Sequence, residues 1–295
     1  MLNYLPFVLL AIFCLISAYF SRRLDKSAEY RKKRRPFTGD MRLIRRPGES
    51  LYKQIEEIDK QLSMKLFLIL YSGMAAVMIV GFFSSLLHVS IPNQSIICIL
   101  VTIAYSIFMV VSFKKMVGLV ESRRKKYLGY FGECAVAEYL DTLKQSGYYV
   151  FHDFPCDDSG SKFNIDHVVV GPTGLFAIET KTRSKYWPLE DQRREQIEFD
   201  GEKLNFSWGP ETEQIKQAAG RARWLATQFS LKYFAQPILT FPGWQVVERE
   251  IVNVWVLYPG GLATAIRKRS KRSLNPAEIE EIRNYLEKAC RDVEY

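Results

Sequence analysis

Near its middle the chain reads Ile165-Asp166-His167-Val168-Val169-Val170-Gly171-Pro172-Thr173-Gly174-Leu175-Phe176-Ala177-Ile178-Glu179-Thr180-Lys181, and this stretch decides the fold of the C-terminal half. Two short runs of β-branched and aromatic residues flank a Gly-Pro-Thr-Gly cluster, a pattern typical of a β-hairpin. In an antiparallel pair, residues at the open end of a hairpin lie side by side. We therefore expect Asp166, at the mouth of one strand, to lie beside Glu179, near the end of its partner.

Lys181 adds a positive charge to this pair of carboxylates. It is two residues after Glu179, so both side chains point to the same face of the strand. Two carboxylates with a lysine suit a hard, oxygen-ligated cation such as Mg²⁺ or Mn²⁺ bound beside a polarising ammonium group, with Asp166 and Glu179 as the ligands of the cation. The same spacing also occurs in solvated strand faces and cross-strand ion pairs.

Further motifs occur in a fixed order around this core, and together they resemble the NERD (nuclease-related) domain of the restriction-endonuclease-like PD-(D/E)xK superfamily. The resemblance covers residues 127–260 and implies an α/β fold with a mixed central sheet flanked by helices. It also implies metal-dependent hydrolysis of phosphodiester bonds, with DNA as the expected substrate. The supporting motifs are Gly132-Glu133, residues 148–154, Phe199-Asp200-Gly201, Gln217 and residues 237–243.

The resemblance adds site residues to the three named above. It implies that Glu133 is a further metal ligand or orders water around the metal, although an exposed helical glutamate is the alternative. It implies that Gln217 faces the site, with Gln214 one turn earlier as the alternative. Arg183 and Lys185 are either contacts to the substrate backbone or plain surface charges. The segment 182–191 departs from the family pattern because it is bulky and lacks glycine.

The remaining pattern predicts the other elements of an α/β domain. Because side chains alternate along a strand, we expect His167 to point away from the metal and to pack within the sheet. The expected helices are 127–145, 211–233 and 276–293, the last capped by Asn275; the expected strands are 148–154, 197–199, 203–206, 236–240 and 252–257, with a loop at 156–163.

Three uncharged apolar runs precede this domain and have the length of membrane spans. They predict transmembrane helices at 1–20, 66–87 and 95–113. Residues 21–65 then form a basic linker with a short helix, and residues 261–295 form a basic segment with an amphipathic C-terminal helix. The first run is expected to be an uncleaved anchor, because its positive charges follow the apolar residues.

The distribution of charge predicts the topology of these spans. Residues 21–47 contain 11 Lys and Arg against 3 Asp and Glu, and residues 114–126 contain 6 against 1. By the positive-inside rule, the N-terminus is outside and the C-terminal domain is cytoplasmic, at the inner (plasma) membrane. The chain has a net charge of +9, but residues 127–295 alone have a net charge of −3. The overall positive charge therefore indicates topology rather than DNA affinity.

Two classes of function remain open from the sequence. The first is a membrane-anchored nuclease, and the second is an inactive membrane-tethered module that binds nucleic acid or a protein. The acidic balance favours the second, because nucleic-acid affinity depends on neutralising phosphates. A transporter is disfavoured because the spans lack charged residues. The five cysteines form no Cys-x-x-Cys pair and indicate neither disulfides nor zinc. The oligomeric state is not indicated.

Overall fold

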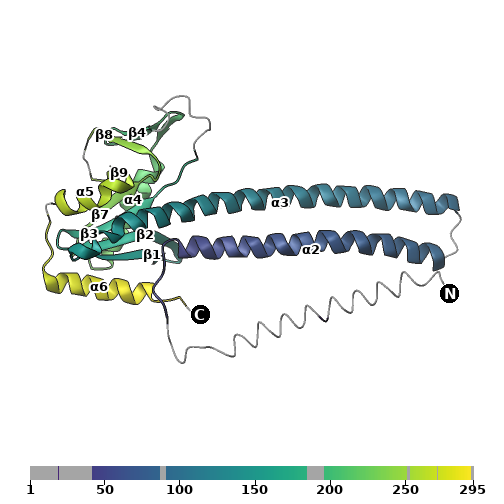
Figure 1. Ribbon diagram of the computed structural model, residues 1–295, viewed down its shortest axis with the longest axis horizontal. Coiled ribbons are helices and arrows are strands. Elements are labelled where there is room, and N and C mark those ends of the chain that lie inside the picture. The colour runs from purple at the N-terminus through teal and green to yellow at the C-terminus, as the bar shows by residue number, and fades with distance from the viewer. Residues whose placement is uncertain are drawn as a thin grey trace. The chain divides into compact units, whose positions relative to one another are not determined.

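The computed structural model of the chain describes Tyr19 and residues 42–86, 91–184, 196–250, 253–270 and 272–293. The chain divides into two compact units (Figure 1). The C-terminal unit consists of Arg42–Ile55 and Arg124–Glu294, and the helical unit contains Glu56–Arg123. The predicted span 1–20 lies outside the described residues apart from Tyr19, as does linker segment 21–41.

Two long helices, α2 and α3, supply the helical unit and continue into the C-terminal unit. The shorter elements lie entirely in the C-terminal unit. In chain order the elements are α2 (Glu49–Leu86), α3 (Ile91–Asp141), β1 (Tyr149–Asp158), β2 (Ser161–Gly171), β3 (Gly174–Thr180), β4 (Gln196–Phe199), β5 (Leu204–Phe206), β6 (Gly209–Glu211), α4 (Glu213–Thr227), β7 (Ala235–Thr240), β8 (Gln245–Glu248), β9 (Trp255–Leu257), α5 (Leu262–Lys268) and α6 (Pro276–Cys290), with short 3-10 turns at Lys144–Ser146 and Pro259–Gly261.

The centre of the C-terminal unit is a mixed five-stranded sheet with the strand order β1-β2-β3-β7-β9. The pairs β1–β2 and β2–β3 are antiparallel, whereas β3–β7 and β7–β9 are parallel. A second sheet has the order β6-β5-β4-β8. The α/β class and the mixed sheet flanked by helices are confirmed.

Strand β3 is buried along its whole length because helices cover both sheet faces. Leu175 and Ala177 pack in one apolar cluster with residues of α4 and α6. Phe176 and Ile178 alternate with them and pack in a second cluster with residues of α3 and α5. A continuous apolar run is the expected sequence of a strand buried on both faces.

Helices α2 and α3 run side by side in the helical unit (Figure 1). The Tyr105 hydroxyl donates a hydrogen bond to the Ile69 carbonyl at 3.1 Å, and Arg123 Nε lies 2.6 Å from Asp59 Oδ1. Among the described residues one helical stretch, Ile99–Ser146, is long and apolar enough to cross a membrane, and an 18-residue window within it has a mean hydropathy of 1.6. The three-span arrangement stays a prediction.

Several predicted elements have different extents in the structure. The expected loop at 156–163 is wrong, because β1 and β2 continue through it and leave a tight turn at Ser159-Gly160, both with positive φ. The helix predicted at 211–233 ends at Thr227. The hairpin of β4 and β5 is confirmed by the pairing of Phe199 with Leu204. The cap of α6 is confirmed as a reciprocal capping box between Asn275 and Glu278.

Candidate active site

Asp166 on β2 and Glu179 on β3 occupy facing positions at one edge of the central sheet. The strands pair with His167 opposite Ile178, so the next position outward brings Asp166 level with Glu179. By strand alternation both acidic side chains lie on the same face as Val168 and Ala177, which is the face that packs against α4. The hairpin register therefore brings the two carboxylates together.

Each carboxylate has a hydrogen-bond donor from β3 or the residue after it. The backbone amide of Thr180 donates to Asp166 Oδ2 at 2.7 Å, and Lys181 Nζ donates to Glu179 Oε1 at 2.6 Å. The Glu179 side chain is only 3% exposed, whereas that of Lys181 is 22% exposed. The ammonium group is thus held at a buried carboxylate while it remains accessible from solvent.

Arg221 on α4 joins the two carboxylates. Its Nη1 atom lies 3.5 Å from Asp166 Oδ1 and also donates to Glu179 Oε2. Its guanidinium carbon lies 5.8 Å from the centre of the Phe163 ring. Sequence reasoning did not assign Arg221 a role. The available signal was its spacing: it follows Gln217 by four residues and lies on the same helix face.

Burial and like charge raise the pKa of Asp166 to about 8. Burial is the largest cause and the neighbouring Glu179 carboxylate adds to it, while Arg221, the Thr180 amide and Lys181 oppose it. One guanidinium and one ammonium therefore do not fully compensate the buried Glu179 and the partly buried Asp166 beside it. An additional cation at this position would stabilise both carboxylates.

Glu133 approaches the site from α3. It is 7% exposed, and its Oε2 atom has no hydrogen-bond partner among the described residues. Burial raises its pKa to about 10, and the charges of Asp166, Asp153 and Glu179 contribute. The predicted alternative of an exposed helical glutamate is therefore wrong.

Gly132 allows α3 to approach the end of β3. A Cβ atom on Gly132 would lie 2.2 Å from Thr182 Cγ2 and 3.7 Å from Thr180 Cγ2. Any side chain at this position would push the helix away from the strand, and Glu133 with it. The glycine of the Gly132-Glu133 motif is therefore needed for a steric reason, because it lets the helix come close enough to place Glu133 at the site.

The other predicted site residues are less closely connected. Gln217 is half-buried on α4, and no hydrogen bond joins it to the described site residues. Gln214 donates to Glu211 Oε2 at 2.5 Å. Arg183 also binds Glu211, through Nη2 at 2.9 Å, so its charge is neutralised away from the two carboxylates. Lys185 lies outside the described residues.

The donor set fits a metal ion only in part. Among the residues that the structure describes, no group of three or more His, Cys, Asp or Glu side chains is placed to share an ion. Asp166 Oδ1 and Glu179 Oε2 nevertheless converge on a single cationic nitrogen. Two carboxylates are the usual protein contribution to a Mg²⁺ site, because water and phosphate oxygens complete the octahedron.

Asp153 on β1 lies opposite Asp166 on β2 by the register of the two strands. It binds residues from the segment 42–50, which is distant in the sequence. Its carboxylate accepts hydrogen bonds from the Ser50 amide (3.0 Å), the Ser50 hydroxyl (2.6 Å), Asn164 Nδ2 (2.9 Å) and Arg45 Nη1 (3.2 Å). Arg45 also binds Asp292 through two atoms. Sequence analysis placed residues 42–50 in the linker, because nothing local in them indicates this contact.

His152 and His167 form a buried pair on the opposite face of the sheet. Their Nδ1 atoms are 2.9 Å apart, and burial lowers the pKa of both residues, that of His152 to about 4. One ring donates and the other accepts, so the pair is neutral. This arrangement agrees with the expectation that His167 packs within the sheet.

Comparison with known proteins supports the expectation from the motifs. Residues 128–242 match the model of the nuclease-related domain (NERD). A 64-residue stretch is 36% identical to an uncharacterized protein of Bacillus anthracis, covering 21% of this chain and 30% of that protein. The chain thus spans less than a third of that relative's length. No significant match to a solved structure was found.

Proposed function

We propose that this chain, which carries a nuclease-related domain over residues 128–242, is a metal-dependent phosphodiester hydrolase that cleaves DNA at the inner face of the plasma membrane. The observation that carries the proposal is the convergence of Asp166 and Glu179 with Lys181 bound to the second carboxylate. Two adjacent carboxylates that are largely removed from water repel each other, and a bound cation would offset this cost.

The chain's own residues have distinct roles in this proposal. Asp166 and Glu179 would hold Mg²⁺, which supplies electrostatic stabilisation of the phosphate and acidifies a bound water. Lys181 is partly exposed and would meet the scissile phosphate, where its charge offsets the negative charge that develops in the transition state. Glu133 would order water beside the carboxylates through its unpartnered oxygen.

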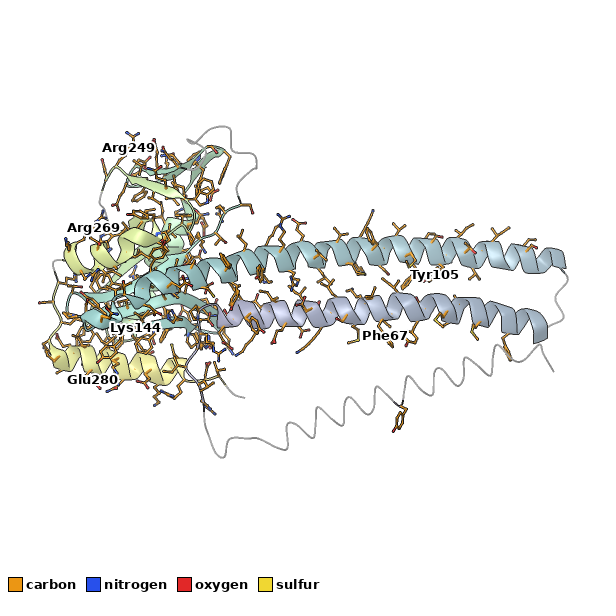
Figure 2. The ribbon with its side chains drawn as sticks, viewed as in Figure 1. Phe67, Tyr105, Lys144, Arg249, Arg269 and Glu280 are labelled. Carbon is orange, nitrogen blue, oxygen red and sulfur yellow. The ribbon has the colours of Figure 1, made fainter. Side chains whose placement is uncertain are left out.

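Exposed apolar side chains on the two long helices support membrane anchoring. Such a band is unfavourable in water and marks a contact with lipid or protein. Phe67 on α2 is 50% exposed, and Figure 2 labels its position beside that of Tyr105 on α3. Others between residues 66 and 113 with at least 50% exposure are Leu66, Leu68, Ile96, Ile99, Leu100, Ile103, Ile107, Val110 and Phe113. With basic segments at 21–47 and 114–126, this pattern favours a cytoplasmic C-terminal unit.

A second candidate is a binding module that does not cleave. The contact of Arg221 with both carboxylates favours it, because a guanidinium group there neutralises the acids without a metal ion. In this case Asp166, Glu179 and Arg221 form a structural ion cluster. The two candidates differ in whether a divalent cation binds the carboxylates.

The test uses the full chain in detergent, because a fragment that starts near residue 120 would lack the Ser50 and Arg45 contacts to Asp153. Labelled single- and double-stranded DNA and RNA are incubated with the protein and Mg²⁺, Mn²⁺ or chelator. The variants are Asp166→Asn and Lys181→Met. Lys216→Met is the control matched to Lys181→Met. It removes the same charge, but from an exposed residue of α4 that does not contact the two carboxylates.

We expect metal-dependent cleavage that both site variants lose and that Lys216→Met retains. Cleavage of DNA and not RNA would identify the substrate class. A folded wild-type protein that cuts no substrate under any metal condition would contradict the proposal and favour the binding module.

A further inference from the structure

A cavity of 480 Å³ lies at the opposite end of β3 from the two carboxylates. Strands β3, β7 and β9 are parallel to one another, so their amino ends share this edge of the sheet. Leu175 at the start of β3 lines the cavity, whereas Glu179 lies four residues further along the strand. At about 3.3 Å per residue, the two sites are on the order of 13 Å apart.

Two arginines, Arg269 and Arg272, line the cavity, and one of them gives it a positive charge. Arg272 makes no ion pair with any carboxylate among the described residues, and its guanidinium carbon lies 3.9 Å from the centre of the Phe234 ring. Arg269, labelled in Figure 2, donates to Glu248 Oε2 at 2.5 Å and is therefore neutralised. One guanidinium group thus faces this cavity without a compensating acid in the part of the chain that the structure describes.

Flat groups and amides complete the lining. Phe234 is 41% exposed, and its ring already holds the Arg272 guanidinium in a stacked position. Gln236 Nε2 donates to the Asn253 carbonyl at 2.7 Å, which fixes the side-chain amide and leaves its oxygen as an acceptor. A cavity of this size accommodates a small organic ligand.

We propose that this cavity binds a nucleoside phosphate, either as a free nucleotide or as the terminal nucleotide of a nucleic-acid strand. The unpaired guanidinium of Arg272 binds the phosphate, for which its planar donor geometry is suited. The base stacks against the Phe234–Arg272 pair, since bases stack on both aromatic rings and guanidinium planes. The Gln236 amide oxygen accepts from an amino group of the base.

The site is tested with the full chain in detergent and in chelator, which excludes cleavage during the measurement. A fluorescent ATP analogue and a fluorescein-labelled ten-nucleotide oligo(dA), whose adenine carries the amino group that Gln236 would bind, are titrated separately, each with and without inorganic phosphate as competitor. The variants are Arg272→Gln and Phe234→Ala. Lys268→Gln is the matched control, because it removes the same charge from an exposed residue of α5 outside the cavity.

We expect binding of at least one probe, weakened about tenfold or more by Arg272→Gln and by Phe234→Ala and less than twofold by Lys268→Gln. Binding of the ATP analogue identifies a free nucleotide as the ligand; binding of the oligonucleotide alone identifies a strand end. Binding of neither probe, or equal losses in Arg272→Gln and Lys268→Gln, overturns the proposal. Asp166→Asn should keep the Arg272-dependent binding, so this result is independent of nuclease activity.

Discussion

Replacing Asp153 by alanine is expected to lower the free energy of unfolding of the C-terminal unit by about 3–4 kcal/mol. The substitution leaves the Ser50 amide, the Ser50 hydroxyl and Asn164 without this acceptor, whereas Arg45 keeps the Asp153 backbone carbonyl and Asp292 as acceptors. Unsatisfied buried donors cost roughly 1–3 kcal/mol each. Release of the buried carboxylate offsets part of this cost, since burial raises its pKa above the ordinary value despite four donors. Alanine at φ +48° adds about 1 kcal/mol of strain.

The measurement is urea-induced unfolding of the full chain in detergent, followed by tryptophan fluorescence. All five tryptophans lie between residues 187 and 255, so the signal reports the C-terminal unit. Ser50→Ala should cost about 1 kcal/mol, and the double variant with Asp153→Ala should show a coupling energy of about 1 kcal/mol. Asp153→Asn keeps the side-chain shape and tolerates positive φ, so it separates the loss of charge from backbone strain.

Asp200→Ala is the matched control for this prediction. The Asp200 carboxylate also accepts three hydrogen bonds, from the amides of Glu202 and Lys203 and from Asn205, but it is exposed in a turn. Its loss should be much smaller, because water replaces the lost acceptor. A loss below 1 kcal/mol for Asp153→Ala, or one equal to that of Asp200→Ala, would refute the reasoning.

Three further predictions concern the packing, charge and pH dependence of the same unit. Gly132→Ala should lower the free energy of unfolding by about 1–3 kcal/mol, because the added Cβ atom would meet Thr182. Gly220→Ala should raise it by about 1 kcal/mol, because the Cβ atom there meets open space. Equal effects of the two substitutions in urea unfolding would contradict the close approach of α3 to β3. Arg221→Gln should lower the free energy of unfolding by about 2–3 kcal/mol in chelator, because two adjacent carboxylates lose their counter-ion. For the same reason, Mg²⁺ should raise the melting temperature of this variant more than that of the wild type. An equal increase in both proteins would show that the ion binds elsewhere. The pKa of His152 is about 4 in the folded chain and 6.5 in the unfolded chain, so the unfolded chain takes up a proton first as the pH falls. The free energy of unfolding is therefore fully retained above pH 6.5 and decreases by up to about 3 kcal/mol as the pH falls towards 4. His152→Gln should therefore flatten the acid side of the stability profile, and an unchanged slope in unfolding measurements from pH 4 to 7 would contradict this.

The local parts of the fold could be predicted from the sequence. The turn cluster at 171–174 and the apolar runs beside it set the register of β2 and β3, and this register alone places Asp166 beside Glu179. The cap of α6 was predictable for the same reason, because Asn275 and Glu278 interact within one turn.

The missed features depend on contacts between distant parts of the chain. Arg221 meets the two carboxylates only because α4 packs on the face of the sheet that carries them. Arg45 looked like one of many linker arginines, and its partners Asp153 and Asp292 lie more than a hundred residues away. The pattern of a helix or linker does not reveal which sheet residue it will contact.

The two-part construction of the C-terminal unit sets an order of events during synthesis. Within this unit, Arg42–Ile55 leaves the ribosome before the rest, and Asp153 follows about 100 residues later. At about 5–20 residues per second, the early segment waits roughly 5–20 s for its acceptor. Residues 56–123 emerge in between, so a helical pair that inserts into a membrane would do so before the carboxylate of Asp153 exists. Membrane insertion would then precede assembly of the acidic site, and the newly made chain would complete its site only after it is anchored.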